Sequence, residues 1–128
     1  MPEPTRILLA EDDRFLRRAA EARLRQRGYH VTVAVDGEEA LRFARTEAPD
    51  LVLLDLIMPK MQGFQVLRAL KEDATTATIP VIVLSNLGQD RDIRQAMNDG
   101  AIAYYIKANL SLQDLAEKVE LALGRGVA

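Results

Sequence analysis

Five short apolar runs alternate with segments of helical periodicity along the chain, and this alternation restricts the fold more than any other feature. The runs cover residues 7–10, 31–35, 51–54, 81–84 and 103–106. Helix-end signals accompany the helical segments: Gly28 after the first, Asp36 before the second and Ser111 before the last. Strands that alternate with helices pair in parallel through right-handed crossovers. We therefore predict an α/β fold: a doubly wound, five-stranded parallel sheet with five helices on two faces.

Length and composition indicate one globular domain and exclude several classes of protein. The chain has 128 residues, so we expect a single domain over 1–128, with a core of about 6–123 and a tail or linker start at 124–128. A net charge of −2 disfavours direct nucleic-acid binding, and no apolar run is long enough for a membrane span. The absence of cysteine fits a reducing cytoplasm, and His30, the only histidine, excludes polyhistidine metal sites.

The residues of two runs indicate where those strands lie in the sheet and which way their side chains face. The run at 31–35 contains Thr32 among small apolar residues, which predicts a strand at an edge of the sheet. Tyr104 and Tyr105 occupy successive positions of the last run, and successive side chains of a strand point to opposite faces. We expect one tyrosine to face a core and the other to face out.

Polar side chains occur directly after four of the five runs. In an open parallel sheet, ligands bind outside the carboxyl ends of the strands, near the change in strand order. We therefore expect these residues to meet in one cleft, although they lie far apart in the sequence. They are Glu11, Asp12 and Asp13 after the first run, Asp55 after the third, Ser85 and Asn86 after the fourth, and Lys107 after the fifth.

The residue types in this set predict phosphoryl transfer to an aspartate. Glu11, Asp12 and Asp55 would repel one another at close range unless a cation lay among them. Oxygen ligands without histidine or cysteine favour Mg²⁺ first and Mn²⁺ second. Lys107 supplies a positive charge and Ser85 a hydroxyl donor for an anion, which completes the groups that such a transfer needs.

Each residue also has a simpler structural explanation. Asp12 and Asp13 precede a helix and could cap it, and Ser85 alone would be a turn residue. Asp55 follows a buried run and could form a structural ion pair with Lys107. The common placement of these residues at strand ends favours the functional interpretation.

The ordered motifs resemble the receiver domains of bacterial two-component response regulators, from about residue 6 to residue 123. The motifs are ILLAEDD at 7–13, LLDLIMP at 53–59 with Gly63, VLSN at 83–86, and GA at 100–101 leading to YYIK at 104–107. The resemblance implies a flavodoxin-like sheet with strand order 2-1-3-4-5.

The resemblance also implies a role for each matching acidic residue. Asp55 would be the phosphoacceptor, which attacks the phosphorus of a phosphohistidine on a partner protein. Glu11, Asp12, Asp55 and the main-chain oxygen of Ile57 would hold Mg²⁺. Asp13 lies one position beyond the acidic pair and is expected to cap a helix.

Further roles follow from the resemblance at the last two strands. Lys107 would contact the phosphoryl group, Ser85 would move onto one of its oxygens, and Tyr104 would turn inward when Ser85 moves. The output surface would be helix four, strand five and helix five. The fourth helix, expected to end before Gly100, has a sparse apolar stripe and should be loosely held.

Two positions depart from the receiver pattern. Receivers usually have proline after the lysine, with a cis bond between them, whereas this chain has Ala108 after Lys107. Either the site stores the strain of a cis bond here as well, which we favour, or the bond is trans and Lys107 points in a different direction. Asn86 stands where a small residue is usual and could crowd the phosphoryl group. Because Ile57 and Leu87 offer no polar group that would align a water, we also predict slow autodephosphorylation.

The resemblance implies a signalling switch that is not itself an enzyme. Its partners would be a sensor histidine kinase or histidine phosphotransfer protein, and a downstream protein or output domain. A phosphorylation-dependent homodimer is one further expectation. The alternatives are a phosphorylation-independent interaction module, a small aspartyl-phosphate hydrolase, for which no cap or second acid/base residue is found, and the receiver portion of a longer regulator.

Overall fold

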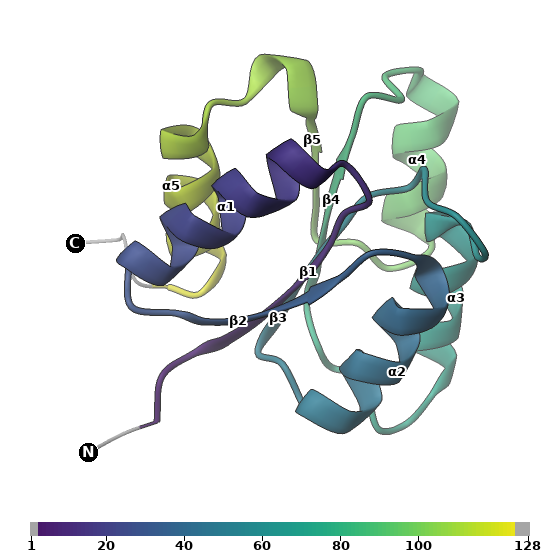
Figure 1. Ribbon diagram of the computed structural model, residues 1–128. Coiled ribbons are helices and arrows are strands. Elements are labelled where there is room, and N and C mark those ends of the chain that lie inside the picture. The colour runs from purple at the N-terminus through teal and green to yellow at the C-terminus, as the bar shows by residue number, and fades with distance from the viewer. Residues whose placement is uncertain (1–2, 125–128) are drawn as a thin grey trace.

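The computed structural model describes residues 3–124 and contains a five-stranded parallel sheet between two layers of helices (Figure 1). The strands lie in the order β2-β1-β3-β4-β5, which confirms the predicted doubly wound topology. The strands are β1 (Arg6–Ala10), β2 (His30–Ala34), β3 (Leu51–Leu54), β4 (Val81–Ser85) and β5 (Ala103–Ile106). The helices are α1 (Arg14–Gln26), α2 (Gly37–Glu47), α3 (Gly63–Glu72), α4 (Asp90–Asn98), the 3₁₀ helix η1 (Lys107–Asn109) and α5 (Leu112–Ala122).

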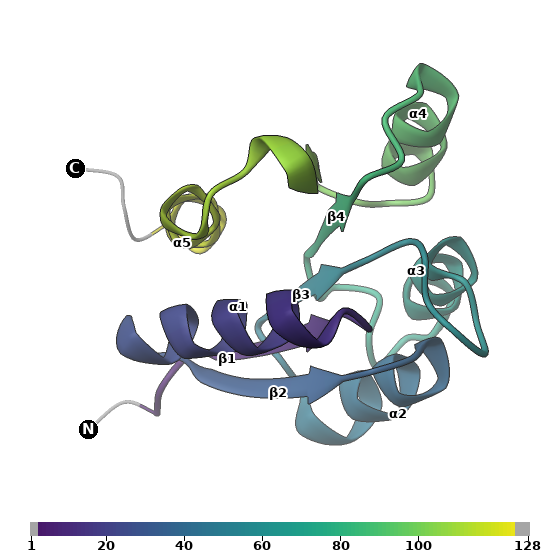
Figure 2. The ribbon, with the colours of Figure 1, turned by 45° about the horizontal axis from the view of Figure 1, so that its top comes forward.

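Two separate cores hold the layers together. α1 and α5 pack on one face of the sheet, and α2, α3 and α4 lie on the other (Figures 1 and 2). The apolar runs at 7–10, 51–54 and 81–84 are buried at every position, as expected for strands covered on both faces. β2 lies at an edge of the sheet, which confirms the prediction made from its polar threonine.

Local sequence chemistry sets the helix ends. The side chains of Asp13, Asp36 and Ser111 each accept a hydrogen bond from the backbone N–H three residues later, at 3.0, 2.9 and 3.0 Å. Each thereby satisfies one N–H that has no partner within the helix. Gly28, after α1, has a φ of +91°, which favours glycine at this position. The cap predicted at Asp13 is therefore present.

The expectation for the two tyrosines of β5 is only half right. Tyr104 and Tyr105 point to opposite faces, but both are half-buried. Tyr104 packs against the core under α2, α3 and α4, whereas Tyr105 packs against the core under α1 and α5. The Lys118 Nζ also lies 5.4 Å from the centroid of the Tyr105 ring. Neither ring faces out, because helices cover both faces of the sheet even at this edge.

Two further predictions concern the C-terminal tail and the lack of a membrane span. Apart from Gly124, the tail predicted at 124–128 lies outside the described residues. Within residues 3–124, no helix has both the length and the apolar character needed to cross a membrane.

Candidate functional site

The predicted polar residues meet in one cleft at the carboxyl ends of β1, β3, β4 and β5. The cleft has a volume of about 380 Å³. Of the residues predicted for the site, Ser85 and Tyr104 do not line it, and Ala108 lies beside it. The lining residues are Glu11, Asp12, Asp13, Asp55, Ile57, Asn86 and Lys107.

A single ammonium group joins two buried carboxylates at the floor of this cleft. The Lys107 Nζ lies 2.6 Å from Glu11 Oε1 and 2.7 Å from Asp55 Oδ2. Glu11 is 2% exposed and Asp55 is 4% exposed. Burial acts to lower the pKa of Lys107, but the hydrogen bonds to Asp55 and Glu11 outweigh burial and raise this pKa overall. Lys107 therefore remains a cation.

The acidic side chains of the cleft are suited to a divalent metal ion. One carboxylate oxygen from each of Glu11, Asp12 and Asp55 lies within 4.8 Å of the other two. The pKa of Glu11 is raised from 4.5 to about 7, with burial as the largest cause; Lys107 and the Asp13 N–H act to lower this pKa, and the nearby Asp55 acts to raise it. A hard cation among these oxygens would relieve both the desolvation and the repulsion.

Main-chain and arginine contacts hold the carboxylates in position. The Asp13 N–H donates to Glu11 Oε2 at 3.1 Å, and the Ile57 N–H donates to Asp55 Oδ1 at 3.2 Å. The Arg17 Nη1 donates to the main-chain oxygens of Glu11 at 3.0 Å and Asp12 at 3.1 Å, and so ties α1 to the acidic loop. Sequence reasoning missed Arg17; the only signal was an arginine in the first turns of a helix that follows an acidic loop.

The loop after β3 requires glycine at position 63. A Cβ atom on Gly63 would lie 2.5 Å from the main-chain oxygen of Asp55 and 2.4 Å from the Cα of Leu56. In the glycine form, the Gly63 N–H donates to the Leu56 carbonyl oxygen at 2.9 Å. The start of α3 is therefore packed directly against the backbone that carries Asp55.

Ser85 and Tyr104 form a second polar group beside the cleft. Ser85 is fully buried at the end of β4, and its Oγ accepts a hydrogen bond from the Leu87 N–H at 3.2 Å. The Tyr104 hydroxyl donates to the Leu87 carbonyl oxygen. Burial raises the pKa of Tyr104, against the lowering effect of the nearby Ser85 hydroxyl. The structure thus links these two side chains to each other through the loop that follows β4.

The peptide bond between Lys107 and Ala108 is trans, so the favoured cis alternative is wrong and the trans alternative holds. A cis bond before a residue other than proline costs about 3–4 kcal/mol, and nothing at this position demands it. Residues 107–109 instead form η1, and the Ala108 N–H donates to Asn86 Oδ1 at 3.1 Å. The two residues that depart from the receiver pattern are therefore bonded to each other.

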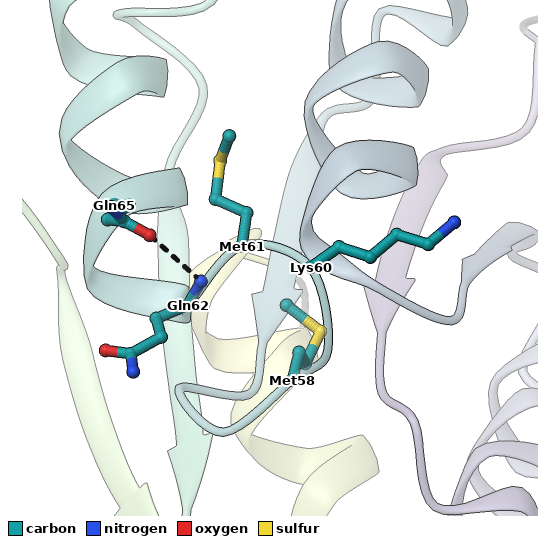
Figure 3. Close-up of a pocket in the computed structure, with 5 residues that line it drawn as sticks. All are labelled: Met58, Lys60, Met61, Gln62 and Gln65. Carbon is teal, nitrogen blue, oxygen red and sulfur yellow. Dashed lines mark hydrogen bonds between the residues drawn. The ribbon is translucent and has the colours of Figure 1, made fainter.

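A second pocket, of about 480 Å³, lies on the loop between β3 and α3 (Figure 3). In this pocket the Gln62 N–H donates to Gln65 Oε1 at 3.2 Å, and the Lys60 side chain points away from both glutamines (Figure 3). Two methionines, Met58 and Met61, complete the lining. No carboxylate lines this pocket, so the smaller acidic cleft is the candidate site.

Comparison with known proteins gives the family. The family model for the response regulator receiver domain matches residues 7–120. A gliding motility regulatory protein of Myxococcus xanthus is 38% identical over 115 residues, which cover 90% of this chain and 15% of that protein. The transcriptional regulatory protein PdtaR of Mycobacterium tuberculosis is 37% identical over 123 residues, which cover 95% of this chain and 58% of PdtaR. This chain therefore spans less than two thirds of either relative.

A solved structure supports the same assignment. The CheY-like response regulator receiver domain protein of Methanospirillum hungatei superposes with a TM-score of 0.88 at 26% identity, over 95% of each chain. The family model covers nearly the whole described fold, including every strand that contributes to the acidic cleft. The chain belongs to the response regulator receiver domain family.

Proposed function

We propose that residues 1–128 form a single receiver domain that accepts a phosphoryl group on Asp55 in a Mg²⁺-dependent reaction. The observation that carries the proposal is the shared ammonium group: Lys107 Nζ lies 2.7 Å from Asp55 Oδ2 and 2.6 Å from Glu11 Oε1 in a cleft open to solvent. A structural ion pair would not need a third carboxylate, Asp12, beside it. A phosphoryl acceptor needs both the cation and the metal ligands.

The acidic residues would hold the metal. Glu11, Asp12, Asp55 and the main-chain oxygen of Ile57 are the proposed protein ligands, and Mg²⁺ is preferred over Mn²⁺ for an all-oxygen set. When bound, the ion would neutralise charge on the transferring phosphoryl group. Lys107 would contact a phosphoryl oxygen and would keep its proton throughout.

The reaction itself requires little of the protein beyond positioning. An Asp55 carboxylate oxygen would attack the phosphorus of a phosphohistidine, so that an O–P bond forms as the N–P bond breaks. The electron pair of the broken bond stays on the imidazole nitrogen, which takes up a proton. The Ile57 N–H, which donates to Asp55 Oδ1 at 3.2 Å, orients the nucleophile. The domain would act once per phosphoryl group, as a substrate that assists its own phosphorylation rather than as an enzyme.

The proposed switch lies one step from the cleft. Ser85 would move toward a phosphoryl oxygen, and its link to Tyr104 through Leu87 would carry that movement to β5. α4, in which Ala96 is the one buried residue, has little holding it in place. The surface of α4, β5 and α5 would therefore change with phosphorylation and contact the output.

The partners follow from the family. We propose that a sensor histidine kinase or a histidine phosphotransfer protein supplies the phosphoryl group, in the cytoplasm. One relative is named for motility and another for transcription, so the family alone does not fix the output. A downstream protein, an output domain and a phosphorylation-dependent homodimer are all compatible with the proposed surface.

The direct test is the intact mass of the protein after incubation with Mg²⁺ and acetyl phosphate. We expect one phosphoryl adduct that requires Mg²⁺ and is absent from Asp55→Asn. The absence of an adduct in wild-type protein that is folded and binds Mg²⁺ would refute the proposal. That result would favour the alternative, a phosphorylation-independent interaction module.

A further inference from the structure

Asn86 and Ala108 lie on the two loops that leave the paired strands β4 and β5. The last pair in the register of these strands is Ser85 with Ile106. Beyond it, the side chain of Asn86 accepts a hydrogen bond from the Ala108 N–H at 3.1 Å. A side chain thus continues the connection between the two strands past the end of the sheet.

This hydrogen bond lies directly beside Lys107. The Leu110 N–H donates to the Lys107 carbonyl oxygen at 3.2 Å and closes η1 from one side. Asn86 accepts from the Ala108 N–H of the same turn. The carbonyl and the N–H of the Lys107–Ala108 peptide are therefore both hydrogen-bonded, and these two contacts fix the main chain at Lys107. Lys107 reaches Asp55 and Glu11 from this anchored turn.

The two residues are chemically matched. Proline has no N–H, so an acceptor at position 86 has a donor to bind only if position 108 is not proline. A small apolar residue at position 86 would leave the Ala108 N–H without this partner. The contact needs a side-chain acceptor at position 86 and a residue other than proline at position 108, and Asn86 and Ala108 meet both conditions. Both departures from the receiver pattern thus belong to one structural unit.

We propose that Asn86 is a positioning residue that fixes the turn carrying Lys107 through the Ala108 N–H. Without a proline after the lysine to restrict the backbone, the hydrogen bond from Asn86 restrains the turn. Asn86 acts on the phosphoryl site through Lys107. The inference deepens the proposed function and rests on it.

The test compares variants that remove one partner at a time. Asn86→Ala removes the acceptor and Ala108→Pro removes the donor, whereas Asn86→Asp keeps an acceptor and Ala108→Ser keeps the N–H. Gln89→Ala, at an exposed position of the same loop, is the matched control. Two quantities are measured: the rate constant of Mg²⁺-dependent phosphorylation by acetyl phosphate, and the hydrogen exchange rate of the Ala108 amide by NMR.

We expect Asn86→Ala to slow phosphorylation by about 2- to 10-fold and to speed exchange of the Ala108 amide by a similar factor, which is the range for one net hydrogen bond. Asn86→Asp should keep the Ala108 amide protected, because its carboxylate also accepts a hydrogen bond, although its negative charge repels the anionic acetyl phosphate. Gln89→Ala should match wild type, and Ala108→Ser should keep the amide at position 108 protected. In an Ala108→Pro background, Asn86→Ala should have no further effect, because no N–H remains.

Two results would overturn the inference. One is an unchanged Ala108 exchange rate in Asn86→Ala. The other is an equal slowing by Asn86→Ala with and without Ala108→Pro, which would mean that Asn86 acts directly on the phosphoryl group. If Ala108→Pro does not fold, the exchange rates of Asn86→Ala and Asn86→Asp still decide the matter. Failure of wild type to form an adduct would instead refute the proposed function, and the exchange measurement does not depend on phosphorylation.

Discussion

Replacing Glu11 with glutamine should stabilise the metal-free protein. Glu11 is 2% exposed and shares the ammonium of Lys107 with Asp55. Its pKa is raised from 4.5 to about 7, which corresponds to about 3 kcal/mol of destabilisation when the side chain is ionised in the folded state. Glutamine resembles the protonated acid in shape and can still accept from the Asp13 N–H. We therefore expect Glu11→Gln to raise the free energy of unfolding by about 1–3 kcal/mol at about pH 8, where Glu11 is ionised.

The pH dependence of the stability difference shows whether ionisation of the buried Glu11 is its cause. Between pH 4.5 and about 7, folded Glu11 holds a proton that the unfolded chain has released. The contribution of Glu11 to the free energy of unfolding therefore falls as pH rises through that range. The advantage of Glu11→Gln should shrink to about 1 kcal/mol or less at about pH 5, because both side chains are then neutral in the folded state.

Urea denaturation in the presence of EDTA, at both pH values, measures the difference. Glu72→Gln, at an exposed position, is the matched control and should change stability by no more than about 0.5 kcal/mol. Mg²⁺ should stabilise wild type more than Glu11→Gln, since the variant lacks a carboxylate of the acidic group. Equal stability of wild type and Glu11→Gln at the higher pH, or an advantage independent of pH, would refute the argument.

Three further outcomes can be checked on the same protein. The phosphorylated form should last for minutes or longer when hydrolysis of the Asp55 adduct is followed by mass, because Ile57 offers no polar side chain to align a water; a lifetime of seconds would contradict this. Gly63→Ala should lower the free energy of unfolding by about 1–3 kcal/mol or more, since its Cβ would lie 2.5 Å from the Asp55 main-chain oxygen. Leu53→Ala, at a fully buried position of β3, should cost about 2–5 kcal/mol in urea denaturation, whereas Leu121→Ala, at a 55% exposed position, should cost much less.

Most of the fold was predictable from local patterns. The buried runs differ from the helical segments in period, and side chains such as Asp36 and Ser111 mark helix starts by chemistry that acts over three residues. The site was predictable for a topological reason, since the carboxyl ends of parallel strands share one edge of the sheet. Glu11, Asp55 and Lys107 therefore meet as expected, whereas their roles in phosphorylation stay predictions.

The features that were missed depend on contacts between loops and helices. The trans bond before Ala108 is accompanied by a contact with Asn86, 22 residues earlier, and no local pattern encodes that contact. The direction of the Arg17 side chain is set by the loop it meets. Tyr105 is covered because α5 extends over the edge of the sheet, and a strand pattern carries no information about how far a helix reaches.

The placement of the tyrosines gives the protein its own optical probes. The chain has three tyrosines and no tryptophan, so tyrosine dominates its near-ultraviolet absorbance and emission. Tyr104 belongs to the core on one side of the sheet, next to Ser85, whereas Tyr29 and Tyr105 belong to the core on the other side. In a Tyr104→Phe variant, the remaining signal reports on the far core alone. The difference spectrum between the two proteins would therefore isolate events on the side of the sheet that carries α4, without any added label.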